Sequence, residues 1–366
     1  MVEKFTHTES RGSDIININL GHKVWTASKR ELKEQIVDIC ENYLDGGYTL
    51  TLRQLYYQLV SQDAIPNHDK VYKKLSSIKD EIVYSGGVDW SVFEDRGRVP
   101  FLPYYENDVK SALEYTAIHY RIDRQRGQNT IVEVWTEKDA ISSILKKITS
   151  YYGVRISVNK GYTSTTAIKG AYDRFIEAIN EGKKIKILYF GDHDPSGLDM
   201  IRDINDRLLN MFCTGEQFDT SLFDRMVFDS DSEAEGELFN EWVKVHSKEF
   251  PQEKDTGKMT IEELKKYQYL PFFKMFFEVV PVGLTMEQIK QYNPPHNPAK
   301  ITDPRAKEYI KKFGEVSWEV DALTPRVMES IVKNGIEEFI DMDLFNEVMS
   351  QESNERNEIK GLIRNI

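Results

Sequence analysis

The sequence contains little cysteine, no long apolar run and no excess of positive charge. Its only cysteines, Cys40 and Cys213, are too few for a disulfide framework or a cysteine-ligated zinc site, and they suit a reducing compartment. No apolar stretch approaches the length that spans a bilayer, and the polar start "MVEKFTHTESRGSD" lacks the apolar core of a signal peptide. We therefore expect a cytoplasmic protein with no membrane partner.

The charge balance does not decide what the protein binds. A net charge of −12 over 366 residues argues against nucleic acid, because proteins that bind it usually carry a basic footprint. The acid is unevenly spread, however: "FDSDSEAEGELFNEW", residues 228–242, is strongly acidic, whereas "NPAKITDPRAKEYIKK", residues 297–312, is rich in lysine and arginine. The length allows two domains or one large domain.

The N-terminal third has the pattern of a small helical domain. Residues 1–22 are predicted to be a flexible arm. Apolar residues at helical spacing then predict three helices, and "VDWSVFEDRGR" predicts a short strand or hairpin; these segments are 28–44, 51–62, 70–87 and 88–98. Three helices followed by a hairpin are the components of a winged-helix DNA-binding domain, although other small helical domains share that order. We assign this domain to residues 23–125.

From residue 130 the pattern changes to alternating strands and helices. The predicted strands are 130–137, 154–161, 184–192 and 276–284, and the predicted helices between and after them are 138–153, 164–182, 197–212 and 285–292. This alternation is typical of a parallel sheet flanked by helices, so we expect an α/β domain over 126–340. An insertion around 213–275 interrupts the alternation, and a helical tail occupies 341–366.

Acidic side chains follow two of the predicted strands. Asp192 and Asp194 lie two residues apart in "YFGDHDPSG", and Glu137 follows the first strand. Function in an open parallel sheet sits at the carboxyl ends of the strands. If these two strands are neighbours, the three carboxylates converge, and carboxylate oxygens are the ligands that Mg²⁺ prefers. Such an ion would polarise a phosphodiester and stabilise its leaving oxygen.

Two other interpretations of "DHDPSG" stay open. An Asp-x-Asp after a strand also occurs as a turn or a helix cap. The motif also fits, loosely, the nucleophile of haloacid-dehalogenase-type phosphatases, but that family carries its motif on the first strand, and here it follows the third. His193 lies between the two aspartates, where an extended backbone points its side chain away from them, so we do not expect it to be a ligand.

Three stretches resemble one family. "VEVWTEKDA", "NKGYTST" and "ILYFGDHDPSGLDM" are similar to the Toprim domain of the topoisomerase VI A subunit and of the meiotic double-strand-break transesterases. The resemblance covers roughly 28–211 and 277–337, and looks closest to compact, stand-alone A-subunit homologues. It implies that Glu137, Asp192 and Asp194 bind Mg²⁺, and it matches Lys138 to the lysine that follows the family's glutamate.

The helix predicted at 51–62 contains two adjacent tyrosines. Thr51 and Gln54 form the pattern of a capping box, so the helix should start at Leu52. Tyr56 falls on the apolar face and is expected in the core, whereas Tyr57 falls off it, one turn beyond Arg53.

We therefore expect Tyr57 to be exposed, with the Arg53 guanidinium near enough to lower the pKa of the phenol or to hold a phosphate. The family resemblance points to the same tyrosine as the nucleophile and to the same arginine. The alternative is that Tyr57 only packs at a domain interface.

The resemblance implies a function. The tyrosine attacks a phosphodiester of double-stranded DNA and forms a 5′-phosphotyrosyl link, as in a DNA topoisomerase. It also implies a nucleoid-associated homodimer, in which Tyr57 of one subunit meets the metal site of the other. Strand passage would need a separate ATPase B-type subunit, because this sequence has no P-loop, so the resemblance supports DNA cleavage better than relaxation of supercoils. A Toprim metallonuclease that uses water, and a non-catalytic DNA-binding subunit, are the alternatives.

Four basic residues are candidates for contacts with the DNA backbone. Arg96 and Arg98 lie in "EDRGR", and Lys300 and Arg305 lie in the stiff loop "NPAKITDPR". A salt-bridged hairpin turn and a surface strut are the respective alternatives. In "SWEVDAL", Glu319 or Asp321 could reach the metal, but we favour a pairing of one of them with a basic neighbour.

Overall fold

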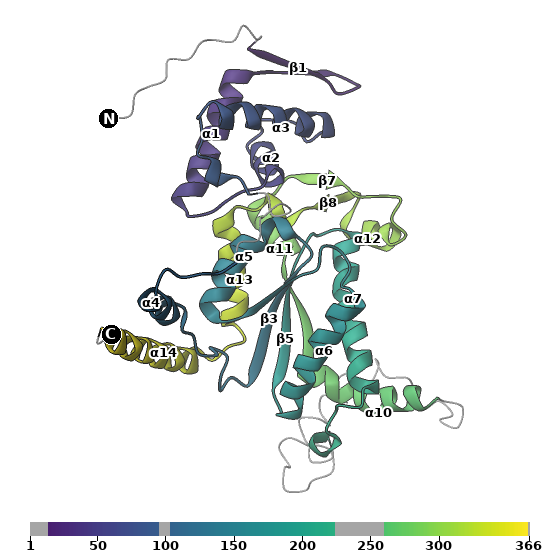
Figure 1. The fold of residues 1–366 in the computed structure, drawn as a ribbon. Coiled ribbons are helices and arrows are strands. Elements are labelled where there is room, and N and C mark those ends of the chain that lie inside the picture. The colour runs from purple at the N-terminus through teal and green to yellow at the C-terminus, as the bar shows by residue number, and fades with distance from the viewer. Residues whose placement is uncertain (1–13, 95–102, 224–259, 365–366) are drawn as a thin grey trace. The chain divides into compact units, whose positions relative to one another are not determined.

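The computed structural model describes residues 14–94, 103–223 and 260–364. Contacts within the chain divide it into two units (Figure 1). The first unit comprises Met1–Val99 and Asp321–Pro325, and the second comprises Pro100–Val320 and Arg326–Ile366. The division falls earlier than the predicted boundary at residue 125, so helix α4 (Val109–His119) belongs to the second unit.

The first unit contains the three predicted helices. They are α1 (Lys29–Asp45), α2 (Leu52–Ser61) and α3 (Asp69–Tyr84). Their apolar faces, with Ile36, Leu55 and Ile78 nearly inaccessible to solvent, form one core. Each helix begins at a residue whose side chain accepts a hydrogen bond from the first turn, which satisfies backbone groups that have no partner within the helix.

Two predictions for the first unit were wrong. Part of the predicted arm is an antiparallel hairpin of β1 (Ile15–Asn19) and β2 (Val24–Ser28). It is ordered because Ile16 is buried against the helices and Gly21 adopts a positive φ in the turn. Within the predicted strand at 88–98, residues Trp90–Val92 form a 3₁₀ turn, after which Phe93 makes a single bridge to Leu50.

The second unit is built on a parallel sheet, which confirms the predicted α/β class. Its strands are β3 (Thr130–Thr136), β4 (Arg155–Val158), β5 (Lys184–Phe190) and β6 (Phe277–Gly283), in the order β4-β3-β5-β6. All neighbouring pairs are parallel. Strand β5 is central and largely buried, which explains its near-continuous apolar run in the sequence.

Helices cover both faces of this sheet (Figure 1). Ile185, Ile187 and Tyr189 of β5 pack in a core with α6 (Thr165–Asn180), α7 (Pro195–Thr214) and α10 (Ile261–Phe276). Leu188 points to the other face, towards Gly335 of α13 (Pro325–Glu337). The remaining elements are the 3₁₀ turns Asp139–Ile141 and Val320–Ala322, α5 (Ser142–Tyr152), α11 (Met286–Tyr292), β7 (His296–Pro298), α12 (Ala306–Phe313), β8 (Val316–Trp318) and α14 (Met342–Ile363).

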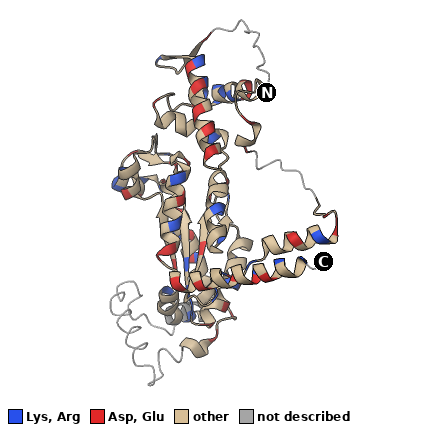
Figure 2. Cartoon of the chain, turned by 90° about the vertical axis from the view of Figure 1, so that its left-hand side faces the viewer, with Lys and Arg blue, Asp and Glu red and all other residues tan. Residues whose placement is uncertain are grey.

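The described helices carry mixed charge (Figure 2). Acidic and basic side chains alternate and pair locally, as Arg202 does with Asp199 and Asp206 on α7. None of the helices in the described ranges has the length and apolar character needed to cross a membrane. The acidic part of the predicted insertion, residues 229–241, lies outside the described residues.

Candidate metal centre

The ends of β3 and β5 meet at one edge of the sheet. The register pairs Thr136 with Phe190, so Glu137 follows one strand where Asp192 follows its neighbour. Glu137 also accepts a hydrogen bond from Asp192 and lies within electrostatic range of Asp194. The expectation that the two strands are adjacent is therefore confirmed, and it brings Glu137 beside Asp192 at this edge.

A lysine lies between the acids. The Lys138 ammonium is 2.7 Å from Oδ2 of Asp192 and 3.0 Å from Oε2 of Glu319. The other oxygen of Asp192 accepts a hydrogen bond of 2.9 Å from the backbone N–H of Val320. The Lys138 and Asp192 side chains are 13% and 10% exposed, so solvent screens this contact little. Positive charge between the strand-end acids is thus supplied by the chain itself.

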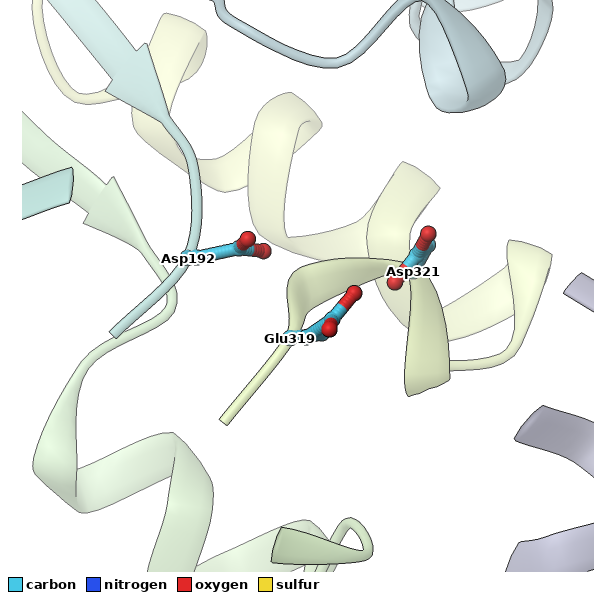
Figure 3. Close-up of side chains that lie close together, drawn as sticks. All are labelled: Asp192, Glu319 and Asp321. Atoms are coloured by element: carbon cyan, nitrogen blue, oxygen red, sulfur yellow. The ribbon is translucent and has the colours of Figure 1, made fainter. Parts of the chain in front are cut away.

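Three carboxylates lie close enough to share a cation. One oxygen from each of Asp192, Glu319 and Asp321 lies within 4.8 Å of the others (Figure 3). Asp321 follows Glu319 by two residues on the same segment, and its side chain is fully buried. Partly buried carboxylate oxygens fit a hard divalent cation such as Mg²⁺ or Ca²⁺. Of the predicted ligands, this group contains only Asp192.

The charge state of Glu137 depends on its surroundings. Burial raises the pKa of its carboxyl, and the nearby Asp194 charge raises it further, while Lys138 and the hydrogen bonds from Asp192 act in the opposite direction. The net effect is a raised pKa. A cation bound beside Glu137 would favour the ionised form of its carboxyl, but Glu137 is not a member of the three-carboxylate group.

Asp194 is the N-cap of α7. Its Oδ1 accepts a hydrogen bond of 2.6 Å from the backbone N–H of Gly197, which confirms the cap interpretation for this residue. A side chain at position 197 would bring its Cβ within 2.2 Å of the Asp192 carbonyl oxygen. Glycine is therefore required there for the strand end and the helix start to lie this close. The second carboxylate oxygen of Asp194 takes no part in the cap bond.

His193 points away from the acids, as predicted. The residue is 4% exposed, and its ring lies against Tyr309, Phe313 and Trp318. Burial lowers the pKa of the imidazole. His193 is therefore part of the packing that supports the loop of residues 191–194. It does not belong to the acidic group formed by Asp192, Glu319 and Asp321.

The tyrosine helix begins as predicted, but the expected exposure of Tyr57 was wrong. Thr51 and Gln54 form the capping box and α2 starts at Leu52. Tyr56 and Tyr57 are 5% and 6% exposed. Part of the distant segment 321–325 contacts this helix: Ala322 belongs to the same core, and its carbonyl accepts a hydrogen bond from Gln58. One helical face alone could not reveal a covering segment so distant in sequence.

Arg53 lies beside Tyr57, as its spacing predicts. Its guanidinium is 5.8 Å from the centre of the Tyr57 ring, and its Nε lies 3.1 Å from Oδ2 of Asp321. Glu319 and Asp321 of "SWEVDAL" thus both pair with a basic residue, the first with Lys138 and the second with Arg53. The preference for such pairing was correct, and it applies to both acids.

The basic candidates have different surroundings. Lys300 is exposed. Arg305 is held by ion pairs to Asp303 and Asp199, at 2.7 Å and 2.9 Å, so it acts as a strut that ties the proline-rich loop to α7. Arg96 and Arg98 lie outside the described residues.

The fold and site together define an α/β protein with a carboxylate group that could bind a metal ion. Glu319 and Asp321 are the two members that were not among the predicted ligands; their only signal in the sequence is the alternating acid of "SWEVDAL". No protein-family model matches the chain, and no curated protein matches it either.

Proposed function

We propose that this chain is a Mg²⁺-dependent DNA-cleaving transesterase of the topoisomerase VI A type, with a winged-helix-like first unit and a Toprim-like second unit. One observation supports this most strongly: Lys138 joins Asp192 to Glu319 at the sheet edge where Glu137 also lies. These side chains come from two strand ends and a distant segment, and they meet where an α/β sheet places its chemistry.

The acidic group would hold the ion. Asp192, Glu319 and Asp321 would provide oxygens, with Glu137 and Asp194 beside them. When bound, Mg²⁺ supplies positive charge that stabilises the phosphodiester as it reacts. Lys138 would then contribute a second positive charge close to the scissile phosphate.

The reaction would be a transesterification. The phenolic oxygen of Tyr57 forms a bond to phosphorus as the bond to the 3′ oxygen breaks; the phenolic proton is transferred to the leaving oxygen. The products are a 5′-phosphotyrosyl link and a free 3′-hydroxyl. Arg53, beside the tyrosine ring, would hold the phosphate charge. Because Tyr57 is 6% exposed in the single chain, DNA binding would have to uncover it.

The proposed partners follow from the resemblance to the topoisomerase VI A subunit. The substrate would be double-stranded DNA at the nucleoid in the cytoplasm, and a homodimer would supply two tyrosines, one for each strand. Strand passage would need a separate ATPase subunit. Of the two described candidates for a contact with the DNA backbone, Lys300 is exposed, whereas Arg305 is held in ion pairs.

A second candidate function is a Toprim metallonuclease in which water is the nucleophile. The burial of Tyr57 favours it, because a metallonuclease does not need this hydroxyl to reach the phosphate. A non-catalytic DNA-binding subunit is the third candidate. In that case the wild-type chain and the Asp192→Ala variant would bind DNA equally well, and neither would cleave it.

Labelled duplex DNA separates these functions. The protein is incubated with the duplex and Mg²⁺, denatured, and analysed before and after protease digestion. The transesterase predicts a covalent protein–DNA adduct that Tyr57→Phe abolishes and Tyr56→Phe retains. Tyr56 is the matched control because its hydroxyl bonds to Asn67 and to the His68 N–H within the core. Protein-free ends that persist in Tyr57→Phe would instead support the metallonuclease.

A further inference from the structure

His193 joins the end of β5 to β8. Its backbone N–H donates to the Trp318 carbonyl at 2.9 Å, and the Trp318 N–H donates back at 3.1 Å. These two bonds form an isolated antiparallel bridge between segments more than a hundred residues apart in sequence. The loop of residues 191–194, which carries Asp192, and the segment that carries Glu319 are therefore held together by the backbone of His193.

Tyr309, on α12, fixes the same histidine. Its hydroxyl donates to the His193 carbonyl at 2.8 Å and lies 2.9 Å from the imidazole Nδ1. Because the hydroxyl has a single proton, and that proton goes to the carbonyl, Nδ1 is the donor in the second bond. Tyr309 and His193 are 5% and 4% exposed, so both bonds form out of water.

Glu319 is held on both sides by this arrangement. Trp318, the residue before it, bonds to His193, and Val320, the residue after it, donates to the carboxylate of Asp192. Its own side chain reaches Lys138 at 3.0 Å and the amide of Asn297 at 3.2 Å. A small rotation of the His193 backbone would therefore move the Glu319 carboxylate relative to Asp192.

We propose that Tyr309 and His193 are a positioning pair that places Glu319 against Asp192 and thereby sets the affinity of the acidic group for a divalent cation. The inference rests on the cation site of the proposed function. Residues that orient metal ligands through a hydrogen bond contribute to metal affinity although they do not touch the ion. The tyrosine hydroxyl does this here through the histidine backbone.

The test is Mn²⁺ binding by the full chain without DNA, measured by calorimetry or by electron paramagnetic resonance. Tyr309→Phe should weaken Mn²⁺ binding about tenfold, the lower end of the range for such residues. The matched control is Tyr152→Phe. Tyr152 is also buried in the second unit and donates to Glu337 at 2.5 Å, so its variant loses a comparable hydroxyl at another place. Both variants should melt at similar temperatures, and the control should bind Mn²⁺ as wild type does.

A double-mutant cycle identifies the residue through which the pair acts. In a Glu319→Gln background, Tyr309→Phe should change Mn²⁺ affinity less than twofold, because the ligand it positions is already gone. The inference is overturned if Tyr309→Phe leaves Mn²⁺ binding unchanged, if Tyr152→Phe weakens it equally, or if the tenfold loss persists in Glu319→Gln. If the predicted Mn²⁺ pattern holds but no Tyr57 adduct forms on DNA, the inference stands and the proposed function fails.

Discussion

Lys138 and Asp192 form an ion pair of 2.7 Å at the edge of the parallel sheet, and the same ammonium lies 3.0 Å from Glu319. A divalent cation that binds this acidic group must compete with the lysine or bind beside it. The lysine and the cation therefore neutralise the same carboxylates. The dependence of stability on a divalent cation, with and without the lysine, can be measured without any assay of DNA cleavage.

Lys138→Met should make stability depend on a divalent cation. Removing the ammonium leaves two mostly buried carboxylates without their counter-charge, which we expect to cost about 2 kcal/mol in EDTA. Added Mg²⁺ should restore more stability to this variant than to wild type. Urea unfolding with EDTA and with Mg²⁺ measures both effects. In the control Lys160→Met, which removes a surface pair with Asp139, the change should be below about 0.5 kcal/mol.

Two substitutions at Asp194 separate its cap from any role in cleavage. Asparagine can accept the hydrogen bond from Gly197 and should preserve stability, whereas alanine loses the cap and should cost about 1 kcal/mol. If the carboxylate is also a ligand, both variants lose the covalent adduct. Urea denaturation and the adduct assay are run on the same preparations. Full adduct formation by Asp194→Asn would remove this residue from the proposed ligands.

Gly197→Ala should disrupt the loop of residues 191–194, which carries Asp192. The new Cβ would lie 2.2 Å from the Asp192 carbonyl oxygen, so the strand end or the helix must shift. We expect a loss of about 2 kcal/mol and weaker Mn²⁺ binding. Gly170→Ala on α6 is the control, because its Cβ meets only an Arg174 nitrogen at 3.7 Å, and alanine in a helix should be neutral or stabilising. Thermal unfolding and Mn²⁺ titration of both variants test the difference.

Glu352 should control part of the acid sensitivity of the second unit. It is 1% exposed, and Arg124 lies 2.6 Å from it. Burial alone would raise the pKa of Glu352, but hydrogen bonds from Arg124 and from the Ile122 N–H outweigh burial, so the pKa is lowered. A lowered carboxyl pKa in the folded state gives stability that is present above the unfolded-state pKa and is lost as pH falls through the folded-state value.

Because ionised Glu352 stabilises the fold and this contribution is lost at low pH, replacing it should change both stability and its pH dependence. Glu352→Gln should cost about 3 kcal/mol of unfolding free energy at neutral pH and flatten the decline of stability on the acid side. Urea unfolding across a pH series checks both. Glu358→Gln, an exposed site on the same helix, should have little effect. If the unfolding free energy of Glu352→Gln falls with pH on the acid side as steeply as that of wild type, Glu352 does not control this acid sensitivity.

The sheet and the location of the acids could be predicted from the sequence because both depend on local patterns. The alternation of strands and helices predicts a parallel sheet, and two acid-tipped strands predict a charged edge. The capping box at Thr51 and Gln54 likewise fixes the start of α2, because all of its groups lie within four residues.

What could not be predicted depends on contacts between distant segments. Glu319 reaches Lys138 across 181 residues of sequence, and no periodicity in either segment encodes that contact. The same applies to Tyr57: helical spacing places it off the apolar face, but it is buried in a core that also contains Ala322 from a distant segment. The hairpin at 15–28 was missed because its strands are short and its turn depends on one glycine.

In the proposed site, acids from separate strand ends and from the Glu319 segment gather around a divalent cation. A crystal structure with saturating Mn²⁺, in which the ion is located by anomalous scattering, would show whether they do. We expect a peak bonded to Asp192 and to at least one of Glu137, Glu319 and Asp321, with Lys138 moved from its place between Asp192 and Glu319. If no peak is found there and Lys138 still joins the two carboxylates, the acids do not form a cation site.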